Sequence, residues 1–209
     1  MKLNEAKDCF ASAVKDEKNG RKHKGLLAVP ADDQKAREYL VKAKANLELC
    51  DFYREKGFDY KIPEEWFYTL YYCALAILSK FGIESRSQKC TASFLRYVKD
   101  KGIVEYGDEF IDRITVYREK EEKSDVDERE IARYSSSVRS EEVAGKYEYM
   151  NTICKKICLN IWRRGAWIFF CHLPCMHEKF NQEGRCYIYI GKNDDRWFLH
   201  LLRTLRKVF

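Results

Sequence analysis

The sequence predicts an all-α protein, a helical bundle built around one buried central helix. From Trp66 to Leu78 only Thr69 lies outside the apolar, aromatic and cysteine set, and a helix that is apolar on nearly every side is a buried one. That run is also too short to cross a bilayer, which needs about 20 apolar residues. The chain has only three prolines and ten glycines in 209 residues, which favours long helices and few turns.

The ends of the central helix are marked at both sides. Pro63 suits the first helical position, where a missing N–H costs nothing. Glu64 and Glu65 fall in the first turn, where the helix dipole favours acidic side chains. Gly82 suits the position just after a helix, which often needs a left-handed backbone. We therefore expect this helix to begin at Pro63 and to end just before Gly82.

Two helices are expected before the central one. The first covers residues 3–19, and its apolar face consists of Leu3, Ala6, Phe10, Ala13 and Val14. The second begins at a cap on Asp32 or Asp33 and runs to about Lys56, before Gly57. Its alternating four- and three-residue spacing is typical of one helix packed on another, through Ala36, Leu40, Ala43, Leu47 and Cys50.

Three more helices are expected after the central one. Ser85 or Ser87 caps a helix that runs to about Lys101, and Asp108 caps the next. The apolar face of the helix that begins at Asp108 contains Phe110, Ile111, Ile114 and Tyr117. Ser140 caps the last helix, whose apolar positions are Val143, Tyr147, Met150, Cys154, Ile157 and Ile161.

The domain organisation follows from a change in sequence character near each end. We expect an N-terminal helix and basic turn in residues 1–31, a helical bundle in residues 32–163, and a small appendage in residues 164–209. The last segment is rich in aromatic, cysteine and histidine residues and does not continue the bundle pattern.

Charge is distributed unevenly along the chain. Residues 1–45 carry 11 basic and 7 acidic side chains, residues 46–150 carry 17 and 22, and residues 151–209 carry 11 and 4. The net charges are therefore +4, −5 and +7. Basic ends of this kind suit RNA, DNA or an acidic partner, although solvated helix faces give the same composition.

The nine cysteines are expected to be mostly reduced. The N-terminal residues MKLNEAKDCF lack the apolar segment of a signal peptide, which favours a cytoplasmic protein that is not in a membrane. Four cysteines fall at helical core positions and are interpreted as small hydrophobic side chains: Cys50, Cys73, Cys90 and Cys154.

The first candidate site is a phosphate or nucleotide seat at the start of a helix. Arg86, Ser87, Gln88 and Lys89 combine two cations with backbone N–H groups at a helix N-terminus, where anions bind well. An ordinary capped turn with solvated charges is the alternative.

The second candidate site is formed by Arg113, Tyr117 and Arg118. The planar guanidinium groups suit phosphate and would line a groove. The alternative is an intrahelical ion-pair network of the arginines with Glu109, Glu121 and Glu122.

No metal and no cofactor are expected. Two groups of possible ligands have weaker spacing than known metal motifs: Asp125, Asp127, Glu128 and Glu130, and Cys171, His172, Cys175, His177 and Cys186. The chain has no glycine-rich phosphate loop and no Ser-His-Asp arrangement.

Residues 35–160 resemble the HEPN family of small helical bundles from archaea and bacteria. The resemblance is carried by REYLVKAKANLELCDFY, by WFYTLYYCALAILSKFGIESRSQK and by FIDRITVYREKEEKSD. Residues 1–158 as a whole also look like an archaeal member of this family. The resemblance implies an up-and-down bundle that forms a homodimer, and a role in a toxin–antitoxin or defence system. It also implies either RNA cleavage or pairing with a minimal nucleotidyltransferase.

The catalytic motif of the RNA-cleaving members, an arginine followed after four to six residues by histidine, is absent from this sequence. Arg118 stands where that histidine is expected, and Gln88 follows Ser87 where the family commonly has Ser-His. We therefore expect a dimeric nucleic-acid or nucleotide-binding protein. The alternatives are a metal-independent RNase that uses Arg113, Arg118 and Tyr117, and a structural adaptor for a protein partner.

Overall fold

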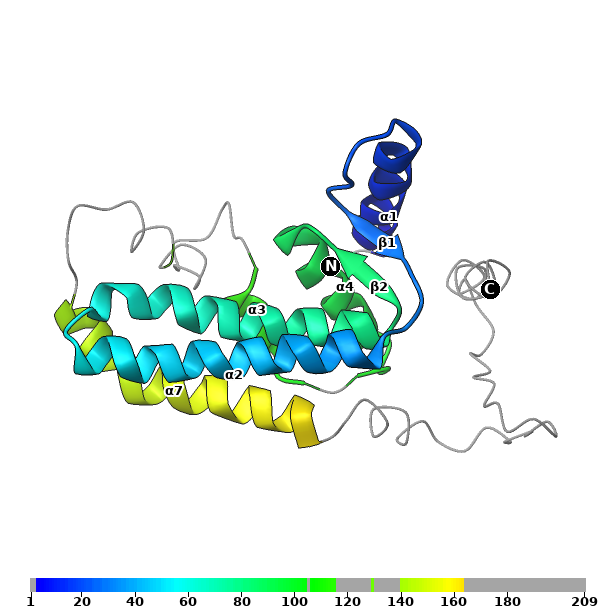
Figure 1. Cartoon of the computed structure of the whole chain (residues 1–209). Coiled ribbons are helices and arrows are strands. Elements are labelled where there is room, and N and C mark those ends of the chain that lie inside the picture. Colours follow the sequence, from blue (N-terminus) through cyan, green and yellow to red (C-terminus); the bar gives the residue numbers. More distant parts are fainter. Residues whose placement is uncertain (1–2, 105, 116–128, 130–139, 164–209) are drawn as a thin grey trace.

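The computed structural model describes residues 3–104, 106–115, 129 and 140–163, and these form an all-α bundle with one short sheet (Figure 1). The fold class predicted from the sequence is confirmed. The elements in chain order are α1 (Leu3–Lys18), β1 (Leu26–Ala28), α2 (Asp33–Glu55), the 3-10 helix η1 (Asp59–Lys61), α3 (Ile62–Lys80), β2 (Ile83–Ser85), α4 (Gln88–Asp100), α5 (Asp108–Arg113) and α7 (Ser140–Arg163).

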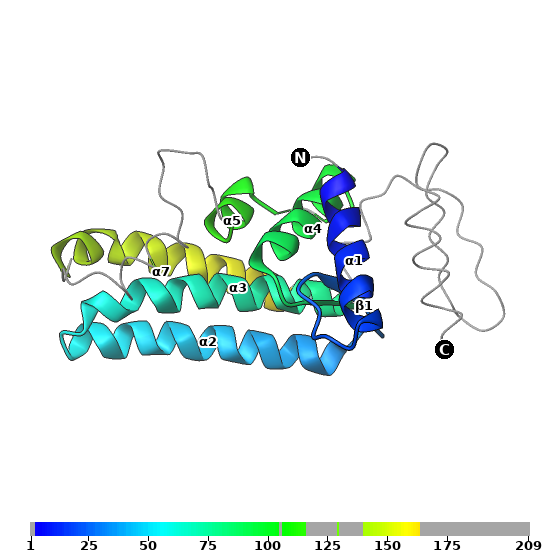
Figure 2. The same cartoon turned by 90° about the horizontal axis from the view of Figure 1, so that it is seen from above.

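Three long helices, α2, α3 and α7, form the body of the molecule. Figures 1 and 2 show them side by side along the long axis, with α4 and α5 over one side and α1 at one end. The chain turns back between α2 and α3, so these helices are antiparallel, and the Thr69 hydroxyl donates to the Ala43 carbonyl across them. Helices α3 and α7 are parallel: Trp66 contacts Asn151, and seven residues further along each helix Cys73 contacts Cys158.

Helix α3 is the buried centre that the sequence predicts. Trp66, Phe67, Leu70 and Leu78 on this helix are almost completely buried. Gly82 follows the helix with a φ of 67°. A Cβ at Gly82 would lie 2.5 Å from the Val29 carbonyl oxygen, so both its backbone conformation and its close neighbour require glycine.

At two helix starts one of the two predicted capping alternatives is correct, and at a third the predicted cap is wrong. The Asp32 side chain accepts from the Lys35 N–H, and the Ser87 side chain accepts from the Cys90 N–H. The prediction that Asp108 caps α5 is wrong. Gly107 is the N-cap, and Asp108 is the first helical residue and pairs with Lys99. An acidic residue in the first turn still favours the helix dipole.

The expected apolar faces are largely buried. Ala6, Phe10 and Ala13 of α1 are buried, whereas Val14 is 44% exposed, so its assignment to the core face is wrong. Val14 directly follows Ala13, and adjacent helical positions point about 100° apart, which takes Val14 off the buried stripe. The apolar positions of α2 and α7 line the core as predicted.

Two short strands, which we did not predict, connect the N-terminal segment to the bundle. Strands β1 and β2 pair antiparallel, with Leu26 opposite Ser85 and Ala28 opposite Ile83. Each strand has three residues, too few to show the alternation by which a strand is recognised in a sequence. The pairing places residues 26–28 beside the turn that leads into α4.

A disulfide between Cys9 and Cys90 joins α1 to α4. The interpretation of Cys90 as a free, small hydrophobic residue is therefore wrong, because its sulfur is covalently bonded. The two cysteines are 81 residues apart, so no local spacing reveals the pair. The other four cysteines that the structure describes, Cys50, Cys73, Cys154 and Cys158, are not disulfide-bonded. Across the part of the chain described here, no helix is both long enough and apolar enough to cross a membrane.

Candidate nucleic-acid interface

A group of aromatic rings lies along the side of α3 that the bundle leaves partly open. Tyr68 and Tyr72 are four residues apart and their rings stack with centroids 6.0 Å apart. Phe67 and Tyr71 show the same spacing, with stacked rings 5.7 Å apart. Residues four apart share one face of a helix, so the local sequence itself brings these rings together. Tyr68, Tyr71 and Tyr72 are half-buried and present part of their surface to solvent.

The aromatic group continues onto α2. Tyr39 of α2 stacks on Tyr72, with ring centroids 6.0 Å apart. Phe67 also packs edge-on against Tyr68, with centroids 5.3 Å apart. Tyr39, Tyr68, Tyr71 and Tyr72 therefore belong to one connected set of rings on two antiparallel helices.

Two cations lie over these rings. The Lys42 ammonium group is 5.8 Å from the ring centroids of both Tyr39 and Tyr72. The Arg129 guanidinium group is 4.5 Å from the centroid of Phe67 and 5.9 Å from that of Tyr68. All four distances are within the range of cation–π attraction. We call the surface formed by Tyr39, Lys42, Tyr68, Tyr71, Tyr72 and Arg129 the tyrosine face.

Lys42 is exposed and has no carboxylate partner among the residues that the structure describes. Two positions further along α2, Lys44 instead pairs with Glu48 in an (i, i+4) ion pair at 3.9 Å. Lys42 therefore keeps its positive charge available to an incoming anion, and Lys44 provides a comparison on the same helix.

The tyrosine face connects to the predicted phosphate seat through Thr91. The Thr91 side chain hydrogen-bonds Tyr71, donates to the Ser87 carbonyl oxygen at 2.9 Å and lies 2.8 Å from the Ser85 hydroxyl. Burial raises the pKa of Tyr71, and the bond with Thr91 offsets part of that rise. The Tyr71 hydroxyl therefore stays protonated and acts as a hydrogen-bonding group rather than as a base.

The structure brings Arg86, Ser87, Gln88 and Lys89 together at the N-terminus of α4, as the sequence predicts. Ser87 is occupied as the helix cap, so its hydroxyl serves the backbone. Lys89 is exposed, and within the described residues it contacts no carboxylate. The first N–H groups of any helix have no intrahelical acceptor. An anion at this turn would therefore meet the Lys89 ammonium group and the first N–H groups of α4.

Arg86 is more restricted than the sequence suggested. Its Nε donates to Glu84 Oε1 at 2.8 Å, and Glu84 also contacts His23 at 3.2 Å and Lys35 at 3.7 Å. Burial raises the pKa of Glu84, but these hydrogen bonds and positive charges outweigh it and hold the pKa below its ordinary value. Glu84 is therefore ionised near neutral pH and neutralises part of the charge of Arg86.

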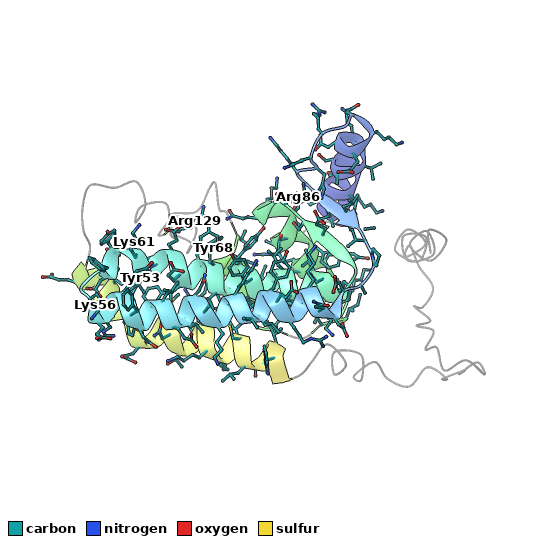
Figure 3. All side chains as sticks on the ribbon, in the orientation of Figure 1. Tyr53, Lys56, Lys61, Tyr68, Arg86 and Arg129 are labelled. Atoms are coloured by element: carbon teal, nitrogen blue, oxygen red, sulfur yellow. A yellow bond between two sulfur atoms is a disulfide. The ribbon has the colours of Figure 1, made fainter. Side chains whose placement is uncertain are left out.

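Figure 3 shows Lys61 near the α2–α3 turn, Arg129 over Tyr68 further along α3, and Arg86 toward the start of α4. Cations interleaved with aromatic rings are the two components of surfaces that bind single-stranded nucleic acid.

The second candidate site is only partly described. Tyr117 and Arg118 lie outside the described residues. Arg113 lies at the end of α5, pairs with Glu109 at 2.8 Å and has its guanidinium 5.7 Å from the Tyr149 ring centroid. The Tyr149 hydroxyl donates to Glu109 at 2.9 Å. The hydrogen bond from Arg113 lowers the pKa of Glu109, with a further contribution from Tyr149. For Arg113, the ion-pair alternative is the one that these contacts favour.

A polar network between α2, α3 and α7 was not predicted. The Trp66 Nε1–H donates to Asn151 Oδ1 at 2.7 Å, and the Asn151 amide donates to Asp51 Oδ1 at 3.3 Å. Tyr147 also donates to Asp51, and Arg54 lies 4.0 Å above the Tyr147 ring. Burial, followed by the hydrogen bond to Asp51, raises the pKa of Tyr147. These contacts fix the relative positions of the three long helices, so we interpret the network as structural.

Among the residues with described positions, no three histidine, cysteine, aspartate or glutamate side chains gather in a way that would hold a metal. Both groups of possible ligands noted in the sequence, 125–130 and 171–186, lie outside those residues.

Comparison with protein-family models, curated proteins and solved structures finds no match for this chain. The interpretation of the site therefore depends on its own chemistry.

Proposed function

We propose that this protein binds single-stranded nucleic acid, RNA above all, along the tyrosine face. The observation that carries the proposal is the ring set of α2 and α3 with Lys42 and Arg129 above it. A base has an aromatic face that stacks on tyrosine whatever its identity, and each phosphate attracts a nearby cation. Duplexes hide their base faces, so a surface of this kind favours single strands.

The turn at the start of α4 extends the proposed binding surface. Thr91 links Tyr71 to this turn, and Lys89 adds a cation beside the helix N-terminus. A nucleic-acid strand whose bases lie on the tyrosine face would place one of its phosphates at this turn, where the N–H groups of the helix donate hydrogen bonds to anions.

Binding is a better-supported role than cleavage. Arg113 is held by Glu109 and lies close to the Tyr149 ring, which leaves its guanidinium poorly placed to stabilise a reacting phosphate. The chain also lacks the histidine that the RNA-cleaving HEPN members use. We therefore propose recognition without chemistry. Homodimerisation, pairing with a nucleotidyltransferase and a toxin–antitoxin or defence setting stay proposals that rest on the resemblance.

The proposal is tested by fluorescence anisotropy with a labelled single-stranded RNA of about 12 nucleotides, within the usual site size of such proteins. We expect Tyr68→Leu to weaken binding by about 1 kcal/mol, since stacking of a base on an aromatic ring contributes about 1–3 kcal/mol. Tyr149→Leu is the matched control, because Tyr149 is 59% exposed and contacts α5 instead of the tyrosine face. Equal loss in both variants, or no binding by the unaltered protein at low salt, would disprove the proposal.

A further inference from the structure

Two cysteines from different helices contact each other in the interior of the bundle. The Sγ atoms of Cys73 on α3 and Cys158 on α7 are 3.2 Å apart, although the residues are 85 positions apart in the sequence. Neither is in a disulfide. The parallel packing of α3 and α7 creates this pair. The same packing creates the contact between Trp66 and Asn151, seven residues earlier on each helix.

The two thiols differ in access to solvent. Cys73 is completely buried, whereas Cys158 is partly exposed. The hydrogen bond to Cys158, followed by burial, raises the pKa of Cys73 well above that of a free thiol. Cys73 is therefore the partner that keeps its proton, and Cys158 is the partner that a small solute reaches first.

The other cysteines of the described core lack one of these properties. Cys50 and Cys154 are buried, and burial raises the pKa of Cys50. The Cys154 sulfur lies beside the Trp66 carbonyl oxygen at 4.0 Å. Cys9 and Cys90 already form a disulfide, which shows that the fold accommodates such a bond between distant elements. Only Cys73 and Cys158, of the free cysteines described, combine sulfur contact with access from solvent.

We propose that Cys73 and Cys158 are an oxidation site that forms a second disulfide when the protein meets a peroxide. In the first step the Cys158 thiolate attacks one peroxide oxygen, an S–O bond forms, and the O–O bond breaks. The displaced hydroxide takes up the proton that the thiol released, and leaves as water. Cys158 is then a sulfenic acid.

In the second step the Cys73 sulfur attacks the oxidised sulfur of Cys158. The S–S bond forms, the S–O bond breaks, and the hydroxide leaves as a second water with the proton of Cys73. The two thiols lose two electrons and two protons in total, and one hydrogen peroxide is reduced to two waters. Because the sulfur atoms are already in contact, the step needs only a small adjustment of the side chains.

The new bond would join the central helix α3 to α7, whereas the existing disulfide joins α1 to α4. A covalent link between distant residues restricts the unfolded chain, so the oxidised protein is expected to melt at a higher temperature than the untreated one. The proposal does not depend on nucleic-acid binding, and the two can fail separately.

The test is peptide mapping of the full chain after brief treatment with hydrogen peroxide. The peroxide is removed with catalase, the protein is unfolded in N-ethylmaleimide, and peptides are identified by mass spectrometry without reduction. We expect both Cys73 and Cys158 to lose the maleimide label and to appear in one linked peptide pair, about 2 Da lighter than the sum of the two thiol peptides.

Two variants make the result specific. Cys158→Ser should leave Cys73 labelled, whereas Cys154→Ser, one turn away on the same helix, should still give the linked pair. The same experiment in a background of Cys171→Ser, Cys175→Ser and Cys186→Ser removes competing thiols from the C-terminal segment. Full labelling of Cys73 and Cys158 after oxidation, a link from either to another cysteine, or further oxidation of Cys158 without a link would overturn the proposal.

Discussion

Tyr39 of α2 stacks on Tyr72 of α3, with 6.0 Å between the ring centroids. The pair spans two antiparallel helices at the surface of the bundle, where the sequence alone predicted a uniformly buried helix. Lys42 lies over both rings, so the contact combines stacking with positive charge. This combination is the physical basis of the proposed nucleic-acid interface.

Replacement of Lys42 by glutamine should reduce the salt dependence of RNA binding. For a single strand, each phosphate contact that is lost lowers the slope of log affinity against log salt by about 0.7. Anisotropy titrations over a range of salt concentrations measure this slope. Lys44→Gln is the control, since Lys44 is on the same helix and pairs with Glu48. An unchanged slope in Lys42→Gln would exclude Lys42 from the interface.

Replacement of Asn151 by leucine should destabilise the bundle. The Trp66 Nε1–H would lose its acceptor in a buried position, and an unsatisfied buried donor costs about 1–3 kcal/mol. Urea unfolding followed by tryptophan fluorescence measures the change. Thr152→Ala on the neighbouring exposed position should change the free energy of unfolding by less than about 0.5 kcal/mol. Similar values for the two variants would show that the polar network contributes no stability.

Reduction of the Cys9–Cys90 disulfide should lower the free energy of unfolding by about 2–4 kcal/mol, the usual contribution of a native disulfide. The bond joins residues 81 positions apart. Urea unfolding with and without dithiothreitol provides the measurement, and the double variant Cys9→Ser, Cys90→Ser should no longer respond to the reductant. If reductant leaves the midpoint of the unaltered protein in place, the two thiols are not bonded in solution.

Replacement of Glu84 by glutamine should destabilise the fold at neutral pH but not in acid. The folded-state pKa of Glu84 is lowered by its partners, so its contribution is complete above the unfolded-state pKa of about 4.3 and is lost as the pH falls through the folded-state value. At neutral pH we expect a loss of about 0.5–1 kcal/mol, small because the group is partly solvated.

The measurement for Glu84 is urea unfolding at a series of pH values, with Glu48→Gln as the control. Glu48 is exposed and, among the residues with described positions, pairs with Lys44 alone, so its replacement should have little effect at any pH. A loss in Glu84→Gln that persists below the pKa of a free glutamate would show that the negative charge is not responsible.

Helix positions and most of the core could be read from the sequence, because both follow from local patterns. The caps at Asp32 and Ser87 and the glycine at 82 need only their neighbours to be recognised. The Cys9–Cys90 bond and the β1–β2 pair join distant segments, and no spacing within one segment encodes them.

The candidate site was found only in part. Arg86 and Lys89 were located from charges beside a helix start, but the carboxylate of Glu84 that restrains Arg86 belongs to the preceding strand. The tyrosines of α3 were attributed to the core as a group. Their four-residue spacing was the available signal, since Tyr68 and Tyr72 share one face, whereas the partner ring of Tyr39 depends on how α2 packs.

Photo-crosslinking of a single-stranded RNA containing 4-thiouridine, followed by identification of the modified peptides, locates the bound strand on the protein. We expect adducts on the peptides that carry Tyr68, Tyr71 and Tyr72, with further adducts beside Lys89. Tyr68→Leu should reduce the first group. Adducts confined to the basic segment 164–209, or an absence of adducts, would contradict a nucleic-acid interface on the tyrosine face.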